Sequence, residues 1–113
     1  MRSVAWPCPA PGGTGEEFAR VAGPEGAPRL LIVPALFEEA NRTRRTLAQA
    51  MRALAARGVA SVLPDLPGCN ESLQPLELQT VEAWQAAVRA GAEHFAATHV
   101  LGIRGGALLL PGN

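Results

Sequence analysis

The sequence contains no lysine and no tyrosine, and its 113 residues include only two cysteines. Without a lysine it cannot form a Walker-type phosphate-binding loop, because that loop needs a lysine to reach the phosphates. The two cysteines, Cys8 and Cys69, are too few for a zinc-ligand set or a disulfide framework. We therefore expect free thiols in a reducing, cytoplasmic environment, and neither a metal nor a cofactor.

Net charge and long apolar runs are also absent. Ten acidic residues balance ten basic residues, all of them arginine, so no electrostatic feature favours nucleic acid or an anionic membrane. The longest apolar stretch, around Leu30 to Phe37, is far too short to span a bilayer. The first residues lack the apolar segment of a signal peptide. We expect neither nucleic acid nor a membrane as a partner.

The chain is long enough for one small domain. Residues 1–28 are rich in proline and glycine, which is typical of turns. Within this segment, Glu17–Val21 allows one extra N-terminal edge strand. We therefore separate residues 1–28, a Pro/Gly-rich N-terminal segment, from residues 29–113, which carry the clearer patterns.

After residue 29, short apolar runs alternate with longer stretches of helical periodicity. The expected strands are Leu30–Val33, Val59–Leu63 and His99–Leu101, and the expected helices cover residues 41–57 and 80–95. Asn41 and Thr80 are the expected N-caps, and Gly58 is expected just beyond the end of the first helix. Because the connections exceed the dozen residues that parallel pairing requires, this order predicts a three-layer α/β fold with a short parallel sheet.

The third expected strand runs into Gly102-Ile103-Arg104-Gly105-Gly106. This is the G-x-S-x-G spacing of a nucleophile elbow, a tight strand-to-helix turn, with arginine in place of the serine. Gly102 and Gly106 meet the need for small residues where the strand and helix backbones approach each other. A guanidinium stays protonated and is no nucleophile, but it binds carboxylate or phosphate through two donors.

Several segments together resemble a known family. Val33–Arg45 is similar to the V-P … E-x-N-x-x-R-R stretch of the exosortase A system-associated hydrolases, which are α/β-hydrolase-like proteins. Pro64–Cys69, Trp84 and Gly102–Leu109 match as well, and that family tends to carry arginine at the elbow too. The resemblance covers residues 29 to 110. It implies a partial α/β-hydrolase-like domain, over residues 29–113, whose three strands lie in the order second, first, third.

The loop Asp65–Ser72 also resembles the D-x-x-G-x-G-x-S loop of α/β-hydrolases, although Asn70 and Glu71 depart from the family pattern. In the family the loop serine is usually structural. The family label implies a hydrolase, but such enzymes continue with further strands that carry an acid and then a histidine. His94 and His99 both precede the elbow. We therefore expect a truncated, hydrolase-like protein that lacks the triad and is inactive alone.

The resemblance puts Arg104 at the nucleophile position, and the backbone N–H groups of Leu36 and Gly105 at the positions of an oxyanion hole. In open α/β sheets, ligands bind at the topological switch point, here between the first and third strands. The loop that carries the candidate binding residues should therefore face Arg104. These residues are Glu38, Glu39 and Asn41.

Two roles for Arg104 stay open. It could pair with Glu38 or Glu39 and so join the two loops, because an unpaired, partly buried charge would be costly. Alternatively, it could bind a small anionic ligand, which would make the chain a non-catalytic binding module. An open sheet edge could also support self-association or binding to another protein.

Overall fold

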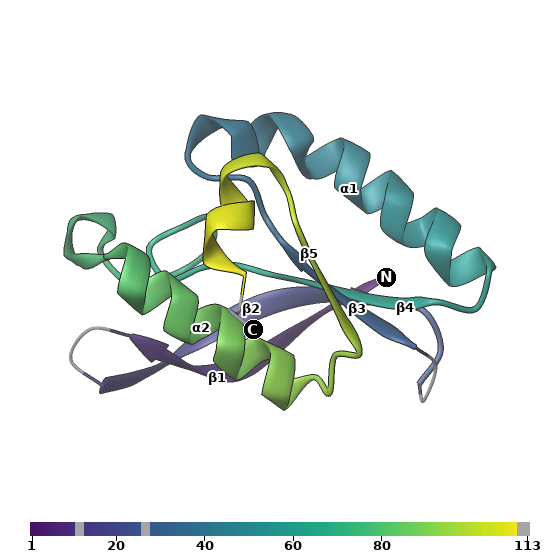
Figure 1. Ribbon diagram of the computed structural model, residues 1–113, viewed down its shortest axis with the longest axis horizontal. Helices are drawn as coiled ribbons and strands as arrows, with labels where there is room; N and C mark the ends of the chain where they lie inside the picture. The colour runs from purple at the N-terminus through teal and green to yellow at the C-terminus, as the bar shows by residue number, and fades with distance from the viewer. Residues whose placement is uncertain (11–12, 26–27, 111–113) are drawn as a thin grey trace.

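The computed structural model describes residues 1–10, 13–25 and 28–110. Five strands form one mixed sheet in the order β1-β2-β4-β3-β5 (Figure 1). The strands are β1 (Arg2–Ala10), β2 (Gly13–Ala22), β3 (Arg29–Val33), β4 (Ala60–Pro64) and β5 (His99–Gly102). The helices are α1 (Glu38–Ala56) and α2 (Val81–His94), with two short 3₁₀ helices, η1 (Leu76–Leu78) and η2 (Arg104–Leu109).

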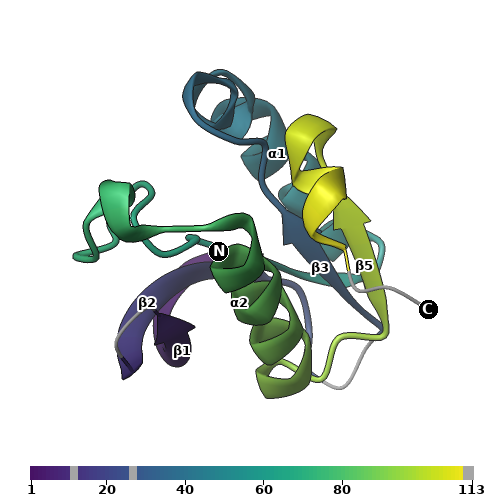
Figure 2. The same cartoon turned by 60° about the vertical axis from the view of Figure 1, so that its left-hand side comes forward.

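The parallel half of the sheet is built from β4, β3 and β5. In this half the first strand lies between the second and the third, as expected, and α1 and α2 form the two crossovers. The helices cover opposite faces of the sheet (Figure 2). The predicted three-layer α/β architecture is confirmed.

Each face of the sheet has its own hydrophobic core, and β3 contributes to both. Leu31 and Val33 pack on the α2 side, in a cluster that includes Trp84. Ile32, between them in sequence, packs on the α1 side with Met51. Successive side chains of a strand point to opposite faces, so a continuous apolar run is what a strand between two layers requires.

The N-terminal segment forms more regular structure than its prolines and glycines suggest. An N-terminal edge strand is present, but it is β1 rather than Glu17–Val21. The latter stretch belongs to β2, which pairs with both β1 and β4. Pro7 and Pro9 are tolerated in β1 because an edge strand leaves N–H positions that need not donate to a neighbour. The expectation of turns is therefore wrong for residues 7–10 and 13–16, which lie in the two strands, whereas residues 23–25 do form a bend and turn; residues 11–12 and 26–27 lie outside the described residues.

The helix ends are confirmed in part. Thr80 caps α2, its Oγ1 accepting a hydrogen bond from the Ala83 N–H at 3.0 Å. Gly58 follows α1 with a φ of 81°, as expected of a residue beyond a helix end. Asn41, however, is not an N-cap, because α1 begins one turn earlier at Glu38. The two glutamates of that first turn favour this earlier start, since negative charge stabilises a helix N-terminus.

None of the helices among the described residues is long and apolar enough to cross a membrane. Beyond β5, the expected α-helix is instead the 3₁₀ helix η2, which starts at Arg104 itself. The outer edge of β5 pairs with no other strand in the described part of the chain. Leu101, on this edge strand, is an exposed apolar side chain.

Candidate functional site

The chain leaves β5 through a tight turn and enters η2 at Arg104. Arg104 has a φ of 50°, which is uncommon for a residue with a side chain. The Ile103 N–H donates to the Val33 carbonyl at 3.0 Å, and the Gly106 N–H donates to the Ile103 carbonyl at 2.8 Å. These bonds hold the turn against the carboxyl end of β3, at the crevice where ligands bind in open α/β sheets.

Two glycines allow this turn because backbone lies directly against backbone. A Cβ on Gly102 would stand only 2.5 Å from the Ala107 Cα. A Cβ on Gly106 would overlap the Pro34 carbonyl oxygen. The steric reason that the sequence offered for small residues at both positions is therefore present in the structure.

The turn carries an ion pair. The Arg104 Nε contacts the Glu39 Oε2, and the side chains are 68% and 44% exposed. The expected pairing of Arg104 with one of the two glutamates is thus observed for Glu39. Exposed ion pairs typically contribute about 0–1 kcal/mol, so this contact orients the guanidinium more than it stabilises the fold. It joins the turn after β5 to the start of α1, which lie near each other in Figures 1 and 2.

Leu36 and Gly105 lie beside this ion pair. A Cβ on Gly105 would stand 3.3 Å from the Leu36 Cδ1, so the two residues are neighbours across the crevice. The Leu36 N–H has no hydrogen-bond acceptor among the described residues. The structure therefore brings together four of the predicted site residues: Leu36, Glu39, Arg104 and Gly105.

The other two predicted site residues lie apart from this group. Glu38 is exposed and makes no ion pair within the described part of the chain. Asn41 lies on α1, where its Oδ1 accepts a hydrogen bond from the Arg44 Nη2 at 3.2 Å. Asn41 therefore orients an arginine of its own helix, and neither Glu38 nor Asn41 makes a contact with Arg104 that the structure records.

The loop after β4 is held by its own polar residues. Asp65 accepts hydrogen bonds from the Asn70 Nδ2 at 2.9 Å and from the Glu71 N–H at 3.4 Å, as a residue that caps a turn would. The Ser72 Oγ accepts from the N–H groups of Gly68, at 2.8 Å, and Gln74, at 3.1 Å. The two acceptor positions of the Ser72 hydroxyl are therefore filled.

The Ser72 hydroxyl donates its proton to Glu17 on β2, at 2.8 Å from the Oε2. Glu17 has no exposed surface, and its Oε1 has no hydrogen-bond partner among the described residues. Burial raises the pKa of Glu17, while the bond from Ser72 acts in the opposite direction and the charge of Asp65 adds to the increase. This buried link between the hairpin and the loop was missed by the sequence analysis, because an acidic residue in a strand is normally exposed.

Neither thiol is suited to act as a nucleophile. Burial, with a smaller contribution from the charge of Glu17, raises the pKa of Cys8 to about 12. Burial, with the charges of Asp65 and Glu17, raises the pKa of Cys69 to about 11. Because the thiolate is the reactive form, a raised pKa disfavours reaction of either sulfur at neutral pH.

Trp84 is buried in the core, and it also positions the loop. Its Nε1 donates to the Pro67 carbonyl at 2.8 Å, so the indole connects α2 to the segment after β4. His94 ends α2 and His99 begins β5, in the structural positions expected for both. The catalytic histidine of a triad is thus not found near the turn in the described residues.

Replacement of Gly106 by alanine should destabilise the fold. The new methyl group would meet the Pro34 carbonyl oxygen, and backbone cannot move aside as a side chain can. We expect the free energy of unfolding to fall by about 1–3 kcal/mol or more, measured by urea denaturation. Gly105→Ala is the matched control, because its methyl group meets only the flexible Leu36 side chain and should change stability by less than about 1 kcal/mol. Equal losses in the two variants would contradict the assignment.

Stability should decrease as the pH rises above the ordinary pKa of glutamate. With its pKa raised by burial, Glu17 holds a proton more tightly in the folded chain, so its contribution is complete below the ordinary pKa and is lost as the pH rises through the raised one. Asp65, whose pKa is raised by burial as well, acts in the same direction. Glu17→Gln should reduce the slope of stability against pH, by at most about 1.4 kcal/mol per pH unit.

Glu16→Gln provides the control for this prediction, because Glu16 is the exposed neighbour on the same strand. Denaturation series between mildly acidic and neutral pH would measure the three slopes. A slope that Glu17→Gln leaves unchanged, or that Glu16→Gln reduces to the same degree, would contradict the role of the buried carboxyl.

Solved structures of α/β-hydrolase fold proteins are similar to this fold. A protein from Agrobacterium vitis S4 aligns with a TM-score of 0.70 and 16% identity, over 89% of this chain and 39% of its own. Epoxide Hydrolase A from Mycobacterium thermoresistibile aligns with a TM-score of 0.68 and 20% identity, over 96% of this chain and 33% of its own. An α/β serine hydrolase without lid from Xanthomonas campestris aligns with a TM-score of 0.63 and 22% identity, over 91% of this chain and 51% of its own.

The chain thus spans about a third of the length of the first two proteins. No protein-family model matches the chain, and no curated protein sequence matches it. At these identities the likeness concerns the fold. The mixed sheet, its strand order and the solved structures together show that the chain has an α/β-hydrolase-like fold.

Proposed function

We propose that this chain is an α/β-hydrolase-like protein of the exosortase-associated type that lacks a catalytic triad and does not hydrolyse esters alone. The observation that carries the proposal is the Arg104–Glu39 ion pair at the turn after β5. A hydrolase of this fold keeps an attacking hydroxyl at the corresponding turn. A protonated guanidinium paired with a carboxylate cannot take that role.

The remaining hydroxyl and thiol groups near the loop support the same proposal. Ser72 donates to Glu17 and accepts from two backbone N–H groups, so its hydroxyl is engaged in holding the loop. Cys8 and Cys69 are protonated thiols at neutral pH because burial raises the pKa of each. Neither the Ser72 hydroxyl nor the two thiols therefore provides the free, activated nucleophile that such catalysis requires.

The exosortase-associated type is proposed from the residues of the Val33–Arg45 stretch. Two of its polar residues have specific contacts that give the pattern a physical purpose. Glu39 pairs with Arg104, and Asn41 accepts a hydrogen bond from Arg44. In such proteins, an arginine at the turn after β5 would thus form an ion pair with a glutamate at the start of α1.

The proposal predicts no esterase activity for this polypeptide. With p-nitrophenyl acetate, the release of p-nitrophenol should match the rate in buffer, both for the intact chain and for Ser72→Ala. A serine hydrolase of the same fold, assayed in parallel, would confirm that the assay detects turnover. A burst of p-nitrophenol that Ser72→Ala abolishes would overturn the proposal, because it would identify Ser72 as a nucleophile.

A second candidate function is a non-catalytic anion-binding module. The Leu36 N–H without an acceptor, the neighbouring Gly105 backbone and the exposed Arg104 side chain favour it. Such donors could hold a carboxylate or a phosphate if the anion displaced Glu39 from Arg104. Glu38, the other acidic residue in the first turn of α1, would then add a negative charge near the bound anion.

Thermal denaturation in phosphate or acetate would test this alternative. Binding at the turn predicts a rise in melting temperature for the intact chain that Arg104→Ala loses, because an anion that binds only the folded state stabilises it. Arg89→Ala, which alters an exposed arginine on α2, is the matched control. Equal shifts in all three proteins would eliminate the anion-binding function.

A non-catalytic module could also act by binding a second copy of itself. The outer edge of β5, unpaired in the described part of the chain, favours such self-association. An unpaired strand edge with an exposed leucine, Leu101, can pair with another chain. Sedimentation velocity at increasing concentration should then show a dimer that a charge at position 101 (Leu101→Lys) disperses. A monomer at every concentration would contradict self-association.

We also propose a cytoplasmic location, because both cysteines are free thiols. Disulfides form mainly in oxidising compartments, so unpaired cysteines suit a reducing one. Alkylation of the protein in intact cells, followed by mass spectrometry, should find both thiols reduced. Oxidised cysteines in that experiment would contradict the location.

A further inference from the structure

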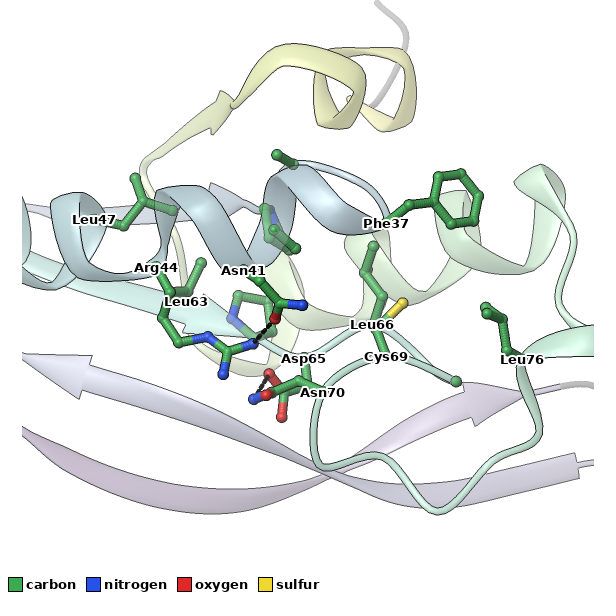
Figure 3. Close-up of a pocket in the computed structure, with 15 residues that line it drawn as sticks. Phe37, Asn41, Arg44, Leu47, Leu63, Asp65, Leu66, Cys69, Asn70 and Leu76 are labelled. Carbon is green, nitrogen blue, oxygen red and sulfur yellow. Dashed lines mark hydrogen bonds between the residues drawn. The ribbon is translucent and has the colours of Figure 1, made fainter.

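A cavity of about 210 Å³ lies on the α1 side of the sheet, beyond the carboxyl ends of β3 and β4 (Figure 3). It is separate from the turn that carries the proposed function, because none of Leu36, Arg104 and Gly105 lines it. One wall is the first half of α1, and the other is the loop after β4. Neither partner of the ion pair that carries the proposed function lines this cavity.

Most of the cavity wall is apolar. Leu47 on α1, Leu63 on β4 and Leu66 in the following loop are buried side chains that line it. Pockets for drug-sized ligands typically measure about 300–1,000 Å³, so this one suits a smaller molecule. Its floor favours an apolar group of a few carbon atoms.

Two opposite charges line the same cavity. Arg44 comes from α1, and Asp65 is the first residue after β4. Both also line an adjoining hollow of about 170 Å³, so they stand where the cavity opens toward β2. Figure 3 shows the guanidinium of Arg44 and the carboxylate of Asp65 on the same side of the cavity.

Each of the two charged groups is held by a neutral neighbour rather than by the other. Arg44 donates to Asn41 at 3.2 Å, and Asp65 accepts from the Asn70 Nδ2 at 2.9 Å. Among the residues that the structure describes, Arg44 and Asp65 make no direct ion pair. They therefore present a positive and a negative group, both pre-positioned, with donor and acceptor capacity still available.

The electrostatics of Asp65 agree with this arrangement. Burial raises the pKa of its carboxyl, while the hydrogen bonds from Asn70 and Glu71 and the charge of Arg44 act in the opposite direction. The charge of Glu71 adds to the increase. A cationic group bound beside the Asp65 carboxylate would offset the energetic cost of burying its charge. The carboxylate would repel a ligand that carries only a negative charge.

We propose that this cavity binds a free α-amino acid with an apolar side chain. The carboxylate of the ligand accepts hydrogen bonds from Arg44, and its ammonium group donates to Asp65. Its side chain lies among Leu47, Leu63 and Leu66. A zwitterion is the ligand class that matches one fixed cation and one fixed anion at once. A simple carboxylate would be repelled by the like charge of Asp65, and a simple ammonium ion would be repelled by the like charge of Arg44.

Isothermal titration with L-leucine tests this inference directly. We expect saturable binding to the intact chain, and no detectable binding of 4-methylpentanoate, which lacks the ammonium group, or of 3-methylbutylamine, which lacks the carboxylate. Arg44→Gln and Asp65→Asn should each weaken the binding of L-leucine about tenfold or more, because each removes a charged hydrogen-bond partner. Asp65→Asn keeps the size of the side chain, and circular dichroism would verify that each variant is folded.

Two control variants also remove the charge of an arginine, but at positions outside the cavity wall. Arg45→Gln alters the exposed arginine next to Arg44 on the same helix, and Arg89→Gln alters an exposed arginine on α2. Both should bind L-leucine as the intact chain does. The inference would be overturned if the intact chain does not bind L-leucine, if it binds 4-methylpentanoate or 3-methylbutylamine equally well, or if Arg45→Gln weakens binding as much as Arg44→Gln. Loss of binding in Arg89→Gln would also overturn it, because that arginine lies outside the cavity wall.

Discussion

The close approach of two backbones at the turn after β5 is the constraint on which the candidate site depends. Gly106 lies against the Pro34 carbonyl oxygen, and Gly102 lies against Ala107. The backbones are so close that there is no room for a side chain at either glycine. This packing leaves the residue between the glycines with a φ of 50° and a side chain that points outward. Whatever residue occupies position 104 is therefore presented at the carboxyl end of the sheet.

At this position the chain presents an exposed positive charge, and α1 supplies an acidic partner that orients it. Helix α1 begins at Glu38, close enough to β3 for Glu39 in its first turn to reach Arg104. Phe37, just before the helix, has a φ of 58°, which is a strained conformation for a bulky residue. Strain at both residue 37 and residue 104 indicates that the two loops on either side of the crevice are held in unusual conformations by the packing around them.

The parallel half of the fold could be predicted because its signals are local. Continuous apolar runs identified three strands, and helical periodicity with Thr80 and Gly58 identified two helices. The start of α1 was placed a turn too late because Asn41 is a good N-cap by type. Only the tertiary structure shows that the two preceding glutamates already lie in the helix.

The N-terminal hairpin and the buried carboxyl could not be predicted in the same way. Strands β1 and β2 contain prolines and glycines, and what stabilises them is pairing over their full length and packing of Trp6 against α2. Likewise, the burial of Glu17 depends on Ser72, which is far away in sequence. A pairing of Arg104 with Glu38 or Glu39 was predictable because a resemblance supplied the strand order that makes the two segments neighbours, but only the structure shows that the partner is Glu39.

The cavity between α1 and the loop after β4 was not foreseen for a related reason. Arg44 was one of several arginines on a helix, and Asp65 was a residue that caps a turn, so neither indicated a ligand by itself. Their significance comes from facing a common space lined by leucines. A site made by two modest residues on separate elements leaves no motif in the sequence.

Glu39 orients the guanidinium at the turn after β5. The most direct measurement is the ¹⁵N–¹H NMR signal of the Arg104 side-chain Nε and its rate of exchange with solvent. We expect a signal with slowed exchange in the intact chain. Glu39→Gln should convert it to the signal of a free arginine, and Glu38→Gln should leave it unchanged. A signal that is already that of a free arginine in the intact chain, or that responds to Glu38→Gln instead, would contradict the role of Glu39.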